Sequence, residues 1–139
     1  MKTDIINNAL EEVGKKEIVG SNHNPKILQY FKTVGHSWVT NDETAWCAAY
    51  VGYVLERSGY SSTRKLNARS YLTYGESTKQ PQKGDIVVFW RNGKNSAYGH
   101  VGFFIRQTKN WIYVLGGNQN NEVNISKYHK TRLLDYRTF

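Results

Sequence analysis

One thiol and four imidazole rings are the groups of this 139-residue chain best suited to nucleophilic chemistry. The thiol belongs to Cys47, the single cysteine, which opens the stretch CAAYVGYVLERSG. A thiol attacks as its thiolate and needs a base nearby to take its proton. His100 is the best candidate for that base because it opens the apolar stretch HVGFFI. The other histidines lie in polar segments typical of a surface: His23, His36 and His129.

The place of Cys47 at the start of an apolar stretch suits a reactive thiol. If Thr44 is the N-cap, Cys47 occupies the third position of a helix. Unpaired backbone N–H groups and the positive end of the helix dipole would then favour the thiolate. The same groups can hold the negative oxygen that forms during acyl transfer. The alternative is a small buried cysteine that only fills space.

A catalytic imidazole usually needs a polar partner that orients its ring. If residues 108–110 form a three-residue turn between two strands, Asn118 lies opposite His100, close enough for a hydrogen bond. A two-residue turn would place Gln119 there instead, and a four-residue turn would place Gly117. We therefore expect Asn118 as the partner, with Gln119 open. The stretch GGNQNN is also explained by turn formation alone.

The sequence pattern predicts that the elements positioning these residues are helices in the first half of the chain and strands in the second. Apolar spacing, N-caps and glycine stops predict four helices, at residues 3–13, 25–34, 45–58 and 68–74. Runs rich in β-formers, separated by turn residues, predict strands at residues 84–91, 100–107, 111–117, 122–126 and 132–137. Helices followed by closely spaced strands indicate an α+β fold with an antiparallel sheet of about five strands. We expect a single domain over 1–139, helical to about 75 and β from about 84.

Composition and charge narrow the class of protein. Hydrophobic residues make up 39% of the chain and aromatic residues 14%, as in a folded globule. A single cysteine forms no internal disulfide, and the N-terminus has no long apolar run, so neither a signal peptide nor a membrane span is expected. The net charge is +8.

The positive charge is unevenly spread. Residues 1–60 contain six basic and seven acidic side chains, whereas residues 61–139 contain thirteen and four. A basic half favours a polyanionic partner such as nucleic acid, anionic lipid or bacterial cell wall, although excess lysine also serves solubility. Because no nucleic-acid-binding motif accompanies the charge, we do not expect a nucleic-acid partner.

Five stretches occur in an order that resembles a known superfamily: DETAWCAAYVGYVLERSGY, ARSYLTYG, KGDIVVFWR, GHVGFF and LGGNQNNEVNISKY. Together they resemble the NlpC-type and CHAP cysteine peptidases and amidases that cut peptidoglycan. They are most similar to a compact subgroup found in phage endolysins and secreted wall-cutting effectors. The resemblance covers nearly the whole chain and implies a papain-like core, in which a nucleophilic cysteine at a helix start packs on a sheet that carries the histidine.

The resemblance also implies roles for individual residues. Cys47 matches the nucleophile, His100 the base and Asn118 the third polar residue, a position that varies within the superfamily. The oxyanion would be held by the amide of Cys47 and a side chain upstream, where residues 42–44 read Asp-Glu-Thr. No cofactor is implied. Asp42 and Glu43 are too few acidic groups to argue for the calcium site of some relatives, so no metal is expected.

The substrate implied by the resemblance is peptidoglycan, and aromatic side chains suit its sugar rings and peptide stems. Trp46, next to the nucleophile, is the first candidate for a substrate-binding wall, and Trp90 is the second. Tyr98 and Gln119 are further candidates. The alternative is that most of these aromatic side chains fill the core. The bond cut stays open between the lactyl–L-Ala amide and a stem-peptide bond such as that between D-Glu and the diamino acid.

Two other classes of protein remain open. One is a non-catalytic module that binds cell wall or a polyanion, and the other is a transglutaminase-like acyltransferase that keeps water from its acyl-enzyme. For a hydrolase made in the cytoplasm without a signal peptide, we expect action in the periplasm or cell wall after phage-type release or dedicated secretion. A holin or an immunity protein would be the partner. We expect a monomer without stable membrane insertion.

Overall fold

The computed structural model describes residues 2–18, 23–39 and 45–139, with helices in the first part and strands in the second. The helical elements are α1 (Thr3–Leu10), α2 (Pro25–Thr33), α3 (Cys47–Arg57) and two 3₁₀ helices, η1 (Ala68–Thr73) and η2 (Lys130–Arg132). The strands are β1 (Glu76–Thr78), β2 (Ile86–Trp90), β3 (Gly99–Gln107), β4 (Trp111–Gln119), β5 (Glu122–His129) and β6 (Leu133–Thr138). None of the helices in these described ranges is long and apolar enough to span a bilayer.

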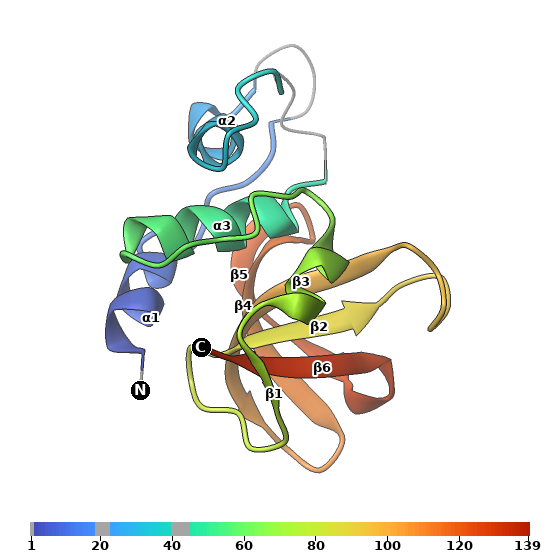
Figure 1. The fold of residues 1–139 in the computed structure, drawn as a ribbon. Helices are drawn as coiled ribbons and strands as arrows, with labels where there is room; N and C mark the ends of the chain where they lie inside the picture. Colours follow the sequence, from blue (N-terminus) through green and yellow to red (C-terminus); the bar gives the residue numbers. More distant parts are fainter. Residues whose placement is uncertain (1, 19–22, 40–44) are drawn as a thin grey trace.

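The six strands form one antiparallel sheet in the order β1-β6-β2-β3-β4-β5, so the predicted α+β class is confirmed. Strands β2 to β5 follow one another, and β6 returns to the other edge of β2 (Figure 1). The expected number of strands was one too low. The additional strand, β1, has the sequence EST, and a polar three-residue edge strand carries no apolar pattern in the sequence.

Helix α3 lies between the sheet and α2 (Figure 1). All its residues from Cys47 to Leu55 are buried, which is expected of a helix covered on several sides. A Cβ atom on Gly52 would come within 2.5 Å of Val34, so the glycine allows the end of α2 to approach α3 closely. The sheet contributes alternate residues to this core, including Val101 and Phe103, while Phe89 and Phe104 belong to a second apolar cluster on its other face.

The capping residues in the sequence correctly predict the start of α2, whereas the predicted end of α1 is wrong. Helix α2 begins as predicted, with Pro25 first and the Asn24 side chain accepting a hydrogen bond from the Lys26 N–H at 2.9 Å. Helix α1 ends at Leu10, three residues earlier than predicted. The following segment pairs with the edge of β5 instead: Gly14 N–H donates to Val123 O at 3.0 Å.

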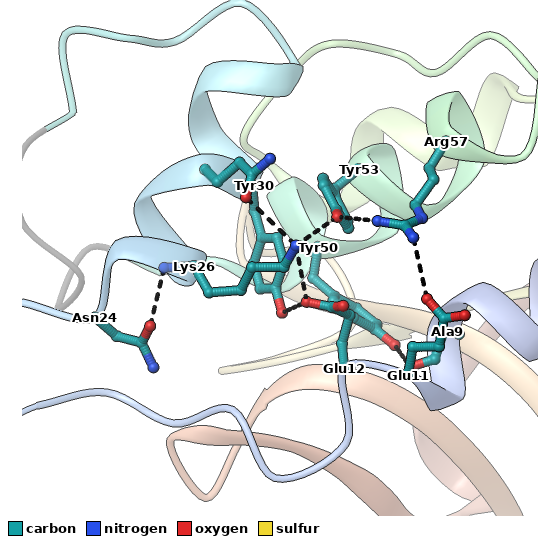
Figure 2. A network of polar contacts seen from close by, with 10 residues as sticks. Ala9, Glu11, Glu12, Asn24, Lys26, Tyr30, Tyr50, Tyr53 and Arg57 are labelled. Atoms are coloured by element: carbon teal, nitrogen blue, oxygen red, sulfur yellow. Dashed lines mark hydrogen bonds and ion pairs between the residues drawn. The ribbon is translucent and has the colours of Figure 1, made fainter.

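A polar network joins the three α-helices, and its centre is the buried carboxylate of Glu12 (Figure 2). The Tyr30 hydroxyl donates to Glu12 at 2.8 Å, and the Lys26 ammonium lies 3.6 Å from the same oxygen. The Tyr53 hydroxyl accepts hydrogen bonds from both Lys26 and Arg57. A buried carboxylate needs such partners, because leaving it unpaired costs several kcal/mol.

The Tyr30→Phe substitution is expected to lower the free energy of unfolding by about 1–3 kcal/mol, because it removes a buried hydrogen bond to a charged group. The matched control is Glu11→Gln, which breaks an exposed ion pair with Arg57 (3.1 Å) in the same network and should change stability by less than about 1 kcal/mol. Urea unfolding at pH 7 measures both. Equal effects would show that burial does not determine the strength of this network.

Candidate active site

Cys47 is the first residue of α3, with Trp46 in the N-cap position. The predicted third helical position is therefore wrong, and the proposed cap, Thr44, lies outside the described residues. The thiol still lies at the helix start, where the backbone N–H groups of Cys47 and Ala48 favour its charged form. The Val101 N–H does the same, so the sulfur lies against β3 at the residue that follows His100.

Burial nevertheless governs the protonation of the thiol. Cys47 is only 7% exposed, and its removal from water raises the pKa of the thiol above the ordinary value. The three N–H groups and the Arg91 charge lower the pKa, but they offset the effect of burial only in part. The expectation that the helix start favours a free thiolate is thus corrected: in the resting structure the thiol is the favoured form.

Trp46 anchors the start of α3 and is fully buried. Its indole N–H donates to Glu17 at 2.7 Å, and its ring packs so closely on β4 that a Cβ atom on Gly117 would lie 2.7 Å from it. The hypothesis that Trp46 forms a substrate-binding wall is therefore wrong, because no face of the indole is open. Its contacts instead fix the backbone just before Cys47.

His100, the second residue of β3, is 1% exposed and packs in a cluster with two aromatic rings. The Tyr128 ring stacks on it with centroids 5.1 Å apart, and the Phe89 ring lies at 6.4 Å. Burial lowers the pKa of the imidazole to about 4, and the nearby Arg91 and Arg132 charges add to that effect. At neutral pH the ring is therefore uncharged and able to accept a proton.

The ring of His100 is held by Gln119, whose Oε1 lies 2.9 Å from Nε2 of the imidazole. The Gln119 Nε2 donates to Val114 O at 3.2 Å and to Asn124 O at 2.8 Å, which fixes the orientation of the amide. Since Oε1 can only accept, the imidazole must carry its proton on Nε2, leaving Nδ1 as the basic nitrogen. Asn124 was not predicted from the sequence, and it supports Gln119 by donating to its backbone oxygen at 2.9 Å.

The expected contact between Asn118 and His100 is not formed, because the strands are irregular. The β3–β4 pairing starts in the two-residue-turn register at Gln107↔Ile112 and shifts by one residue before Phe104↔Val114. A second irregularity in β4 follows Gly116, where Asn118 adopts a positive φ of 54°. A residue in this conformation interrupts the alternation of side chains, so Gln119 faces the imidazole. A methyl group at Gly102 would meet Val114 of β4, so the neighbouring strand fills the space beside this glycine.

If His100 is the base, as expected from the sequence, the Gln119→Met substitution should lower kcat/KM by about 100-fold, because it removes the acceptor that orients the imidazole ring. The control is Asn118→Gly, which tolerates the positive φ and should retain nearly full activity. Initial rates on soluble fragments of peptidoglycan, the substrate that the sequence resemblance implies, measure both variants, with an unfolding curve to confirm that each is folded. A large loss in Asn118→Gly with normal rates in Gln119→Met would restore Asn118 as the orienting residue.

The remaining candidates lie near the end of the β2–β3 pair. Trp90 is half-buried and donates its indole N–H to Thr131 O at 3.1 Å, whereas Tyr98 is 65% exposed. Gln119 is 3% exposed, so it serves the histidine rather than a substrate surface.

Arg69, which sequence patterns did not indicate, binds the 93–98 loop through three backbone oxygens. Within the described ranges, no three His, Cys, Asp or Glu side chains are placed to hold a metal ion.

Comparison with known families agrees with this arrangement. Residues 38–118 match the CHAP domain, and the match covers more than half of the chain, including Cys47 and His100. The chain belongs to the CHAP domain family. The matched region ends one residue before Gln119, so the orienting residue of this CHAP domain had to be identified from the structure. No curated protein matches the sequence significantly.

Solved structures with the same fold extend the likeness to nearly all of the chain. One is a lipoprotein-like protein of the NLP/P60 family from Staphylococcus aureus, with a TM-score of 0.55 and 19% identity over 98% of this chain. Another is the peptidoglycan hydrolase RipB from Mycobacterium tuberculosis, with a TM-score of 0.58 and 14% identity over 97% of this chain. The CHAP domain described here spans 40% and 62% of the lengths of these two proteins. The papain-like fold expected from the sequence is therefore confirmed.

Proposed function

We propose that this CHAP domain hydrolyses an amide or peptide bond of bacterial peptidoglycan through an acyl-enzyme on Cys47. The observation that carries the proposal is a thiol at a helix start, beside a strand whose buried imidazole is oriented by an amide. Acyl transfer requires a nucleophile, a base and an orienting group, and Cys47, His100 and Gln119 have the chemistry for these three roles. The basic C-terminal half and a fold shared with a peptidoglycan hydrolase support the choice of substrate.

In the proposed mechanism, His100 removes the thiol proton as the sulfur attacks the scissile carbonyl. Because the resting pair is neutral, proton transfer accompanies the attack rather than preceding it. The Cys47 N–H stabilises the oxyanion. The C–N bond breaks as the His100 imidazolium protonates the leaving amine. The neutral imidazole then activates water, which releases the acyl group as a carboxylate and restores the thiol.

The experiment that tests the proposal is the digestion of purified peptidoglycan, followed by identification of the new chain ends by mass spectrometry. A new L-Ala amine would assign the lactyl–L-Ala amide, and a new diamino-acid amine would assign the stem-peptide bond. If no new ends form with the folded wild-type protein, the proposal is wrong. Alkylation of Cys47 is a poor test, because the raised pKa of the thiol predicts slow reaction at neutral pH even in an enzyme.

A second candidate, an acyltransferase, is favoured by the near enclosure of the reacting groups. Cys47 and His100 are 7% and 1% exposed, which restricts the access of water to an acyl-enzyme. Adding a primary amine to a peptidoglycan digest distinguishes the two reactions. Transfer products in place of free carboxylates would identify the acyltransferase.

The proposed site of action is the periplasm or cell wall. Delivery there, by phage-type release with a holin or by dedicated secretion with a cognate immunity protein, is part of the same proposal. Co-purification of the chain from its native host with such a protein would test it.

A further inference from the structure

Two arginines, Arg91 and Arg132, carry charges that act on the imidazole of His100, and neither has a carboxylate partner within the described ranges. By contrast, three other arginines form ion pairs with acidic side chains: Arg57, Arg64 and Arg137. Arg69 is occupied by backbone oxygens. Unpaired guanidinium groups beside a reaction centre are suited to bind an anionic ligand.

Arg91 reaches the site from the end of β2. Its backbone N–H donates to Tyr98 O at 3.3 Å, which continues the ladder in which Phe89 pairs with His100. Since side chains two residues apart share a face, Arg91 extends from the same face as Phe89, the residue stacked near His100. Its charge acts on both Cys47 and His100, although the side chain itself is exposed.

Arg132 is the last residue of η2, and hydrogen bonds to the backbone of β2 hold its guanidinium group. Its Nε and Nη2 donate to Trp90 O at 3.3 and 3.2 Å, and its guanidinium carbon lies 5.6 Å from the centroid of the Tyr128 ring. The same tyrosine ring stacks with Phe89 and with His100, at centroid distances of 4.7 and 5.1 Å. Trp90 and Tyr128 therefore hold one guanidinium in place, and Arg91 supplies a second positive charge nearby.

We propose that Arg91 and Arg132 bind a carboxylate of the substrate next to the scissile amide and so determine which peptides are cut. The inference rests on the proposed function and adds a requirement to it: the bond must have an acidic group close by. Arginine suits this role because its planar fork binds a carboxylate through two hydrogen bonds, which a lysine cannot reproduce. Tyr128 would form the apolar floor under the bound group.

The test uses two soluble stem-peptide substrates that differ at one position, where the residue next to the scissile bond carries a free carboxylate or the corresponding carboxamide. Neither substrate contains phosphate, so binding of wall phosphates cannot produce a difference. We expect the wild-type protein to cleave the carboxylate form with a kcat/KM about tenfold to 100-fold higher, mainly through a lower KM. The Arg91→Gln and Arg132→Gln variants should lose most of this preference, and Arg91→Lys should recover only part of it.

The matched control is Arg106→Gln, which removes the same charge from the far end of β3, where the guanidinium lies over the Tyr113 ring. It should keep the wild-type preference. Equal cleavage of both substrates by the wild-type protein, or an unchanged preference in the double variant Arg91→Gln/Arg132→Gln, would overturn the inference while leaving the proposed hydrolase intact. Failure to cleave these substrates and whole peptidoglycan alike would overturn both.

Discussion

Replacing Cys47 by alanine is expected to lower kcat/KM on purified peptidoglycan by at least about 10⁴-fold, to the level of background hydrolysis. In the proposed mechanism the sulfur forms the covalent bond to the acyl group, and no other thiol exists in the chain to take its place. Soluble fragments released from purified peptidoglycan, quantified by mass spectrometry, measure the effect.

The control for this substitution is structural. Because Cys47 packs in the core at the start of α3, circular dichroism and a urea unfolding curve must show that the alanine variant keeps its fold. Cys47→Ser, which keeps the shape of the side chain, should be nearly as inactive. If the alanine variant hydrolyses peptidoglycan at the wild-type rate, Cys47 is a structural residue. If neither protein hydrolyses it but both bind it, the chain is a binding module on this scaffold.

His100→Gln is expected to lower kcat/KM by about 10⁴-fold as well, because the buried thiol has a raised pKa and depends on a base to lose its proton. The glutamine side chain can still donate to Gln119, which limits the structural damage. The same assay measures the loss. Near-normal activity in the folded variant would show that another group deprotonates the thiol.

This variant also has a distinct pH signature. In the folded protein the pKa of His100 is about 4, below the ordinary 6.5, so the unfolded chain binds more protons between these values. The stability that the neutral ring provides above pH 6.5 is therefore lost as the pH falls toward 4. Between pH 7 and 4.5 the wild-type protein should lose about 2–3 kcal/mol from this group, and His100→Gln should not. Parallel stability curves for both proteins would refute the assignment.

The opposite shifts of Cys47 and His100 have one cause. A charged group loses its hydration when it is buried, so burial raises the pKa of an acid and lowers that of a base. Sequence position alone suggested a thiolate stabilised by the helix start, but the fold covers the thiol almost completely. In the resting site both the thiol of Cys47 and the imidazole of His100 are therefore uncharged. The acid limb of the pH profile of kcat/KM should lie near pH 4 rather than near 6.5.

Local patterns were enough to predict most of the elements and to select Cys47 and His100 as the candidate reacting side chains. The Asn24–Pro25 helix start, the apolar stretch after Cys47 and the strand that begins beside His100 depend on nearest neighbours along the chain. A unique thiol and a histidine at the start of an apolar strand are visible in the sequence without any knowledge of their distance in space.

Only the tertiary structure decided which residue orients the imidazole and which aromatic side chains are open to solvent. The exchange of Asn118 for Gln119 depends on the irregularity of β4 after Gly116, where Asn118 has a positive φ, and the periodicity of the sequence does not indicate this irregularity. The burial of Trp46 depends on a contact with Glu17, 29 residues away. The sequence by itself thus determined which groups can react, because that is a property of residue type, whereas their partners, solvation and charge state depend on long-range contacts formed only on folding.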